Sequence, residues 1–249
     1  MPKSPQTALY ISNPGRYKEF IAGIKNFDRI YSGSEFCENK IVHDTKIFEK
    51  LAELNSFSLV LPAVITRDYF KKIEKLILSI ASIQKNFELV VNDFGMLEWY
   101  SQKARKFPLV IGRILCQFNF LTEIKNKGDC KILDIEKCRF SSKEFKVSRY
   151  EISCLPQPHR YILPKGLNIS LYYPYTFITM TRNCSFRPSE ASLDTVCHHE
   201  CGNNQLELTH PSTEDQLLMI NNGYMLDCKP GDLKSVLAPH INRYVWQQL

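Results

Sequence analysis

Three cysteines and two histidines crowd into one short segment of the chain, and both residue types bind metals in proteins. Cys184, Cys197 and Cys201 follow the spacing C-x12-C-x3-C, and His198 and His199 lie between the last two. A tetrahedral metal needs four ligands, so the three thiolates with one imidazole would make a zinc site. The same thiolates would also suit a 4Fe–4S cluster, which takes four cysteines. The segment therefore predicts a metal centre.

The spacing favours an iron–sulfur cluster over zinc. Zinc fingers and ribbons use two tight clamps, whereas one gap between cysteines here is twelve residues. A cluster is wider and commonly takes thiolates from separate loops. The fourth thiolate would then come from Cys37, which follows a predicted strand at 28–33, with Cys116 as the alternative. We interpret Cys154 and Cys228 as packing residues.

The nine cysteines of the chain also raise the question of disulfides. The first residues, MPKSPQTALYIS, contain no long apolar region and no small-residue cleavage site, so we expect a cytoplasmic protein. In a reducing compartment, clustered cysteines are more typical of metal binding than of disulfide bonds. The longest apolar runs are far too short to cross a bilayer, and we therefore expect no transmembrane segment.

The chain carries a net charge of +6, and the excess is unevenly distributed. Residues 125–149 hold eight basic and four acidic side chains, and a basic stretch of this kind can bind nucleic acid. Its charges alternate in sign, however, and it lacks the interleaved aromatic residues of a base-stacking surface. We expect a solvated or partner-facing surface there, and no nucleic-acid partner.

Strand and helix patterns alternate in the first half of the chain. Strands are predicted at 8–12, 28–33, 57–64, 87–93 and 107–116. Helical spacing of the apolar residues predicts helices at 45–54, about 67–83 and 94–106. Continuous apolar strands separated by helices indicate a parallel sheet with both faces covered. At this length the pattern predicts an α/β fold with a (β/α) barrel, closed or incomplete, in a single domain over 1–249.

The second half of the chain is less regular. Residues 117–168 are predicted to form a lid or an insertion, and 169–181 a pair of strands interrupted at Pro174. The cysteine segment at 181–204 follows, and a hairpin is expected around Asn222-Gly223. The end of the chain, 232–249, is predicted to begin as a helix that Pro239 interrupts.

Polar residues at the ends of predicted strands are candidates for a substrate site. Asp93 either caps the helix that follows it or faces a substrate together with Asn92. Arg113 lies within the apolar run VIGRIL, where a buried charge needs a partner. Asp93 would make this a structural ion pair; alternatively, Arg113 grips a substrate carboxylate, since its fork matches carboxylate geometry.

We therefore take Asp93 and Arg113 as catalytic candidates, and Asn92 and Arg113 as substrate-binding ones. Because sites in barrels gather at the carboxyl ends of the strands, four residues are expected on one rim: Cys37, Asn92, Asp93 and Arg113. A small aromatic or carboxylate-bearing molecule would suit them.

Three tyrosines surround Pro174 just before the first clustered cysteine. Core packing is the usual role of such aromatic residues. They would otherwise separate the metal centre from water. On that second interpretation, Tyr173 and Tyr175 are candidates for contact with the substrate.

Several of these motifs occur in the same order in the collagenase-like peptidase superfamily. They are YSGSEFCENK, FELVVNDFGMLEWYSQKARKFPLVIGRIL and YYPYTFITMTRNC with its two later cysteines, and the resemblance covers roughly residues 7–230. Most similar is the cluster-binding UbiU and UbiV branch, whose members act in anaerobic ubiquinone biosynthesis. The C-x4-G-x-C signature of the members named as proteases is not found, so a peptidase is the least favoured interpretation.

The resemblance implies a 4Fe–4S cluster, held by Cys37, Cys184, Cys197 and Cys201, with zinc as the alternative. It further implies a component of an oxygen-independent hydroxylation system that acts on an aromatic or quinone-precursor substrate. In that branch one cluster-binding protein pairs with another, so a heterodimer with a related chain is expected. The alternative function is a non-catalytic partner or scaffold subunit, stabilised by zinc or a cluster.

Overall fold

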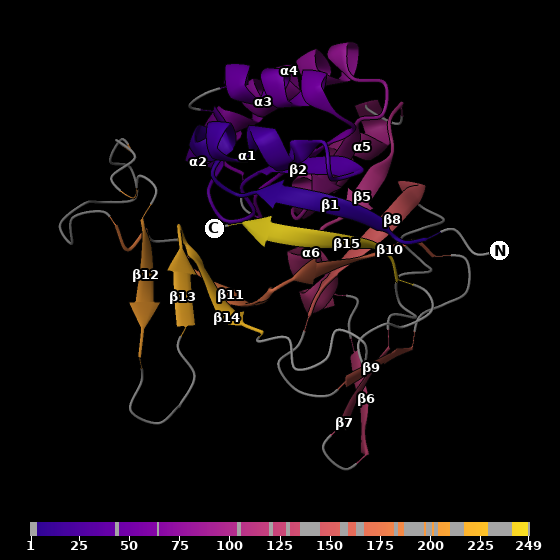
Figure 1. Ribbon diagram of the computed structural model, residues 1–249. Helices are drawn as coiled ribbons and strands as arrows, with labels where there is room; N and C mark the ends of the chain where they lie inside the picture. Colours follow the sequence, from indigo (N-terminus) through magenta and orange to yellow (C-terminus); the bar gives the residue numbers. More distant parts are fainter. Residues whose placement is uncertain are drawn as a thin grey trace.

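In the computed structural model, eight parallel strands close into a barrel, in the order β1-β15-β10-β8-β5-β4-β3-β2 (Figure 1). The strands are β1 (Gln6–Ile11), β2 (Arg29–Gly33), β3 (Phe57–Val60), β4 (Glu88–Val91), β5 (Leu109–Ile111), β8 (Val147–Ser153), β10 (Ile169–Tyr173) and β15 (Ile241–Gln248). The closed barrel confirms the predicted (β/α) barrel-like fold. The structure describes residues 4–42, 45–63, 65–103, 106–119, 122–127, 130–134, 145–154, 159–162, 167–181, 184–186, 197, 201, 204–209, 217–228 and 241–248.

Helices follow the early strands and cover their outer face (Figure 1). They are α1 (Tyr17–Ile24), preceded by the short 3-10 helix η1 (Pro14–Arg16), α2 (Glu38–Val42), α3 (Thr45–Leu54), α4 (Arg67–Ile83), α5 (Phe94–Lys103) and α6 (Arg113–Asn119). The apolar faces of α3 and α4 pack with outward-pointing strand residues such as Leu59 and Leu89 in one core cluster. Strands β2 to β5 are buried along their whole length, which explains the mostly apolar sequence of β3, β4 and β5.

The strand predicted at 107–116 is shorter than expected, because β5 ends at Ile111 and α6 begins at Arg113. The Asn92 side chain fixes this break. Its Oδ1 accepts the Ile114 N–H at 3.2 Å, and a Cβ at Gly112 would lie 2.2 Å from the same oxygen. Cys116 is therefore inside a helix, and the prediction that it ends a strand is wrong.

The second half of the chain differs from the prediction in two places. Strand β15 occupies 241–248, where the sequence predicted no strand, and the helix predicted to begin near 232 and to be interrupted at Pro239 lies outside the described residues. The residues of β15 alternate between buried and less buried, and this period of two is that of a strand. Pairing with β1 on one side and β10 on the other then closes the barrel. Likewise β8, at 147–153, is a barrel strand inside the region predicted as a lid or an insertion.

A second, antiparallel sheet lies at the carboxyl ends of the barrel strands (Figure 1). Its strands are β11 (Tyr175–Met180), β14 (Gly223–Asp227), β13 (Leu217–Ile220) and β12 (Gln205–Leu208), in that order. The break between β10 and β11 at Pro174 is as predicted, and the expected hairpin turns at Asn221-Asn222, one residue earlier than expected. The structure also contains a three-stranded sheet of β6 (Thr122–Lys127), β7 (Cys130–Asp134) and β9 (His159–Ile162).

The antiparallel sheet packs on the barrel rim through a small apolar cluster, which we call the rim cluster. Its buried members are Phe36, Ile114, Phe177, Ile220 and Met225. The Phe36 and Phe177 rings stack with their centroids 5.5 Å apart. The end of the barrel where sites usually open is thus covered, within the described residues, by the chain's own second sheet.

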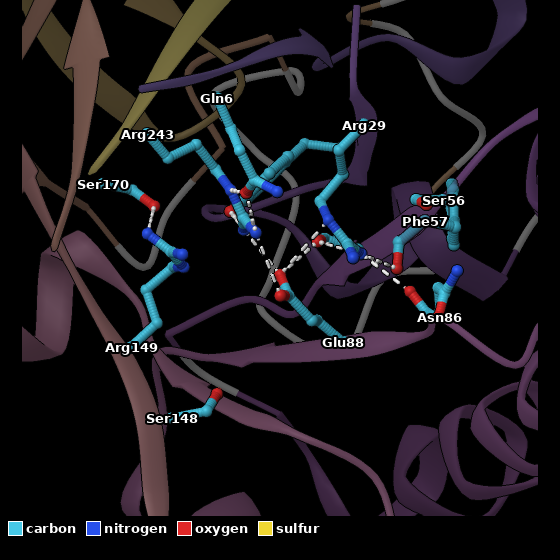
Figure 2. A network of polar contacts seen from close by, with 12 residues as sticks. Gln6, Arg29, Ser56, Phe57, Asn86, Glu88, Ser148, Arg149, Ser170 and Arg243 are labelled. Atoms are coloured by element: carbon cyan, nitrogen blue, oxygen red, sulfur yellow. Dashed lines mark hydrogen bonds and ion pairs between the residues drawn. The ribbon is translucent and has the colours of Figure 1, made fainter. Parts of the chain in front are cut away.

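The interior of the barrel is charged at its amino-terminal end (Figure 2). Arg243 binds both oxygens of Glu88, at 2.6 and 3.1 Å, and Arg29 lies 3.6 Å from the same carboxylate. Burial raises the pKa of Glu88, but the bonds and charge of Arg243 outweigh it and hold the pKa below its usual value. Removing one partner of such a buried pair commonly costs about 3–5 kcal/mol. The network therefore ties β15, β4 and β2 together across the barrel.

Candidate functional site

The four rim residues predicted from the sequence do lie at the same end of the barrel. Cys37 follows β2, Asn92 and Asp93 follow β4, and Arg113 follows β5. The loop to Cys37 begins at Gly33, whose φ of +139° favours glycine and whose Cβ would lie 2.1 Å from the Val60 carbonyl oxygen. The ends of the strands therefore explain why the four residues lie on one rim. Their roles depend on the contacts that each side chain makes.

Cys37 directly precedes α2, and its sulfur accepts hydrogen bonds from the backbone N–H groups of Asn39 and Lys40. Burial raises the pKa of this thiol to about 11, and the N–H groups of Lys40 and Asn39 oppose that rise. The charges of Cys197 and Cys201 raise the pKa further. Cys37 is thus electrostatically connected to thiols far away in the sequence.

Cys201 shows the same connection from the other side. Burial raises the pKa of its thiol, the positive charge of Lys40 lowers it, and the charges of Cys184 and Cys197 raise it again. The two sets of effects together include all four cysteines predicted as ligands. These thiols therefore share one neighbourhood beside α2, and Lys40 is the cation nearest to it among the groups that act on Cys201.

The shared neighbourhood is not yet a coordination site. Among the described residues, no three Cys, His, Asp or Glu side chains are grouped closely enough to hold a metal ion. His198 and His199, the alternative zinc ligands, lie outside the described residues. Four thiols with a nearby ammonium group are nevertheless a donor set that suits iron–sulfur or zinc chemistry. The residues fit such a group in kind.

Arg113 is completely buried, and its partner is Glu35 rather than the predicted Asp93. Its Nε and Nη2 donate to the two Glu35 oxygens at 2.8 and 2.6 Å, and Nη2 also donates to Gln247 at 2.9 Å. Nη1 donates to the Tyr175 carbonyl oxygen at 3.0 Å. Although burial lowers the pKa of Arg113, Glu35 holds it above its usual value. All three nitrogens thus bond within the chain, and the catalytic and substrate-binding roles of Arg113 stay predictions.

Asp93 caps the helix that follows it. Its Oδ1 accepts the Met96 N–H at 2.9 Å, and the Gly95 N–H also bonds to the carboxylate. Asn92 is buried and donates to the Leu61 carbonyl oxygen at 3.0 Å. These bonds give both residues structural roles, and their catalytic and substrate-binding roles stay predictions.

The tyrosines around Pro174 also pack within the fold. Tyr173 lies against Trp246, with ring centroids 5.1 Å apart, and Tyr175 packs against the rim cluster. Tyr172 points into the barrel, where the Arg113 guanidinium lies 4.4 Å from its ring centroid. Contact of Tyr173 or Tyr175 with a substrate is not tested by these positions.

Glu151 is a buried acid that the sequence interpretation missed. Neither of its oxygens makes a short, well-aligned hydrogen bond with a described residue, but the Tyr172 and Tyr31 hydroxyls lie close enough to lower its pKa. Burial and the charge of Glu35 raise the pKa of Glu151 to about 8, while Tyr172 and Arg243 act in the opposite direction. The alternation in β8, VSRYEIS, was the available signal, because it places Arg149 and Glu151 on one face.

Comparisons with protein-family models, with curated proteins and with solved structures found no match for this chain. In the part of the chain that the structure describes, none of the helices combines the length and the apolar character needed to cross a membrane. Function is therefore inferred from the residues of the chain itself.

We predict that Glu151 makes stability fall with rising pH. The folded chain keeps the Glu151 proton up to about pH 8, whereas the unfolded chain releases it near 4.5. Between these values the folded state binds one more proton, so the free energy of unfolding decreases as pH rises. In urea titrations at a series of pH values, Glu151→Gln should remove this decrease, and the exposed-site variant Glu53→Gln should keep it. Parallel curves for wild type and Glu151→Gln would contradict the prediction.

A second prediction concerns the ion pair on the rim. Arg113→Met or Glu35→Gln alone should each lower the free energy of unfolding by about 3–5 kcal/mol, because each leaves a buried group without its partner. The double variant should cost clearly less than the sum of the two. The exposed Arg16–Glu19 pair, changed in the same way, should show little coupling because solvent screens it. Additive losses at Arg113 and Glu35 would show that they are not partners.

Proposed function

We propose that this chain is an iron–sulfur protein whose 4Fe–4S cluster is held by Cys37, Cys184, Cys197 and Cys201. The observation that carries the proposal is the mutual electrostatic effect of these thiols, which come from the β2 rim and from a segment far along the chain. When bound, such a cluster supplies one-electron redox chemistry. A cytoplasmic location would keep the thiols reduced.

Two features beside the thiols oppose burial, which raises the pKa of both Cys37 and Cys201. The start of α2 directs N–H groups of Asn39 and Lys40 at the Cys37 sulfur, and the Lys40 charge lowers the pKa of Cys201. Both effects stabilise thiolate, the form that binds iron and zinc. Soft thiolate donors without a required imidazole suit an iron–sulfur cluster, and zinc remains the alternative metal.

The finer proposal is a component of an oxygen-independent hydroxylation system, of the kind found in the UbiU and UbiV branch. It is supported by the order of the sequence motifs and by the cysteine spacing. On this proposal the chain works as a heterodimer with a related cluster-binding protein. The substrate would be a small aromatic or carboxylate-bearing quinone precursor.

A second candidate is a non-catalytic partner subunit, stabilised by a cluster or by zinc. The observation that favours it is the occupation of the polar rim. Arg113 bonds to Glu35, Gln247 and Tyr175, and Asp93 caps α5, so neither is left open toward a substrate. A subunit of this kind would support catalysis in its partner.

The cluster is tested by purifying the protein without oxygen. It should be brown, absorb broadly near about 400 nm, and contain about four irons and four sulfides per chain. Replacing any of the four ligand cysteines with serine should bleach it. Cys116→Ser is the matched control, since Cys116 is buried in α6, and this variant should keep the colour. Stoichiometric zinc with no acid-labile sulfide would overturn the cluster in favour of His198 or His199 as a zinc ligand.

The two functions are separated by a hydroxylation assay with and without a co-expressed related cluster protein. If this chain's cluster takes part in the reaction, Cys184→Ser should abolish product formation while the complex with the partner persists. Product formation that survives loss of the cluster would instead establish the scaffold role. Complex formation itself can be followed by size-exclusion chromatography, independently of activity.

A further inference from the structure

Two cysteines outside the proposed cluster meet at the barrel rim. Cys154 directly follows β8, and Cys228 directly follows β14. The hydroxyl of Thr176 lies 2.7 Å from the Cys228 sulfur and 3.8 Å from the Cys154 sulfur. Both side chains are buried, with 3% and 4% of their surface exposed. Two sulfurs that contact one hydroxyl are neighbours, although they belong to different sheets.

The backbone around Pro174 holds both cysteines in place. The Pro174 carbonyl oxygen accepts the Cys228 N–H at 2.8 Å and lies 3.3 Å from the Cys154 sulfur. The Cys154 N–H is bonded to the Tyr172 carbonyl oxygen at 2.9 Å. Both residues are therefore fixed to the junction of β10 and β11.

The two thiols also interact with each other. A hydrogen bond between them is the largest influence on both, and it raises the pKa of Cys154 while it lowers the pKa of Cys228. Of the two, Cys228 therefore loses its proton more readily, and Cys154 keeps its own. A thiolate is the nucleophilic form of cysteine, and a second thiol beside it can resolve the first oxidation product.

We propose that Cys154 and Cys228 form a redox-active dithiol that closes to a disulfide when a peroxide reaches the rim. In the first step the Cys228 thiolate attacks one peroxide oxygen. A sulfur–oxygen bond forms, the oxygen–oxygen bond breaks, and the leaving hydroxide takes a proton to become water. Cys228 is then a sulfenic acid.

In the second step the Cys154 sulfur attacks the Cys228 sulfur. The sulfur–sulfur bond forms, the sulfur–oxygen bond breaks, and hydroxide leaves with the Cys154 proton as a second water. Two thiols have lost two electrons, and hydrogen peroxide has been reduced to two waters. The disulfide joins the end of β8 to the end of β14, and so fastens the antiparallel sheet to the barrel. This inference does not depend on the proposed cluster.

The test uses the full chain, purified under argon and treated with increasing hydrogen peroxide. Remaining thiols are blocked with N-ethylmaleimide during denaturation, and unreduced peptides are identified by mass spectrometry. The linked peptide containing Cys154 and Cys228 should appear first, at a rate at least about tenfold higher than the oxidation of Cys116, the control cysteine buried in α6. Dithiothreitol should reduce this disulfide again. The Cys184→Ser variant lacks a proposed cluster ligand, and it should form the same Cys154–Cys228 disulfide because the reaction does not need the cluster.

Two variants test the order of steps. Cys154→Ser should leave Cys228 as a sulfenic acid that reacts with dimedone, whereas Cys228→Ser should leave Cys154 reduced. The wild-type measurement decides the proposal even if a variant does not fold. Cys154 and Cys228 that both stay alkylated while other cysteines oxidise would overturn it, as would a disulfide from either of them to the 184–201 segment.

Discussion

Charged side chains inside a closed barrel cannot reach solvent, so each needs a partner of opposite charge within the fold. Arg243, Arg29 and Glu88 satisfy each other at the amino-terminal end, and Arg113 and Glu35 do so at the other. Each bond joins strands or loops distant in sequence, so the pairs form only when the barrel closes in one register. Buried pairs of this kind add little net stability, but breaking one is costly. Their main effect is to exclude other arrangements.

The same constraint determines what the rim can do. Because Glu35 follows β2 by two residues, the Arg113–Glu35 pair anchors the loop that continues to Cys37. The antiparallel sheet then packs over the rim through Phe36 and Phe177. The thiols gather beside this covered rim rather than in an open barrel mouth.

Much of the fold and part of the site could be predicted from the sequence. Mostly apolar runs identified β3 and β4, because strands buried on both faces allow few polar residues, and a short run of β-favouring residues identified β2. Their position before loops also placed Cys37 and Asp93 on one rim. Strand β15 was not predicted, since residues 232–249 include helix-compatible ones and the buried positions Arg243 and Gln247 interrupt the alternation of apolar residues. Those polar residues face a charged interior that only the closed barrel creates.

The sequence by itself determined the type and order of the early elements and the supply of thiols, because periodicity and residue chemistry are local properties. Tertiary structure decided the partners. It paired Arg113 with Glu35 instead of Asp93, buried the acid Glu151 near Tyr172 and Glu35, and brought Cys154 close to Cys228. These pairings depend on the register and closure of strands far apart in the chain, and no local pattern encodes the distance between two such side chains.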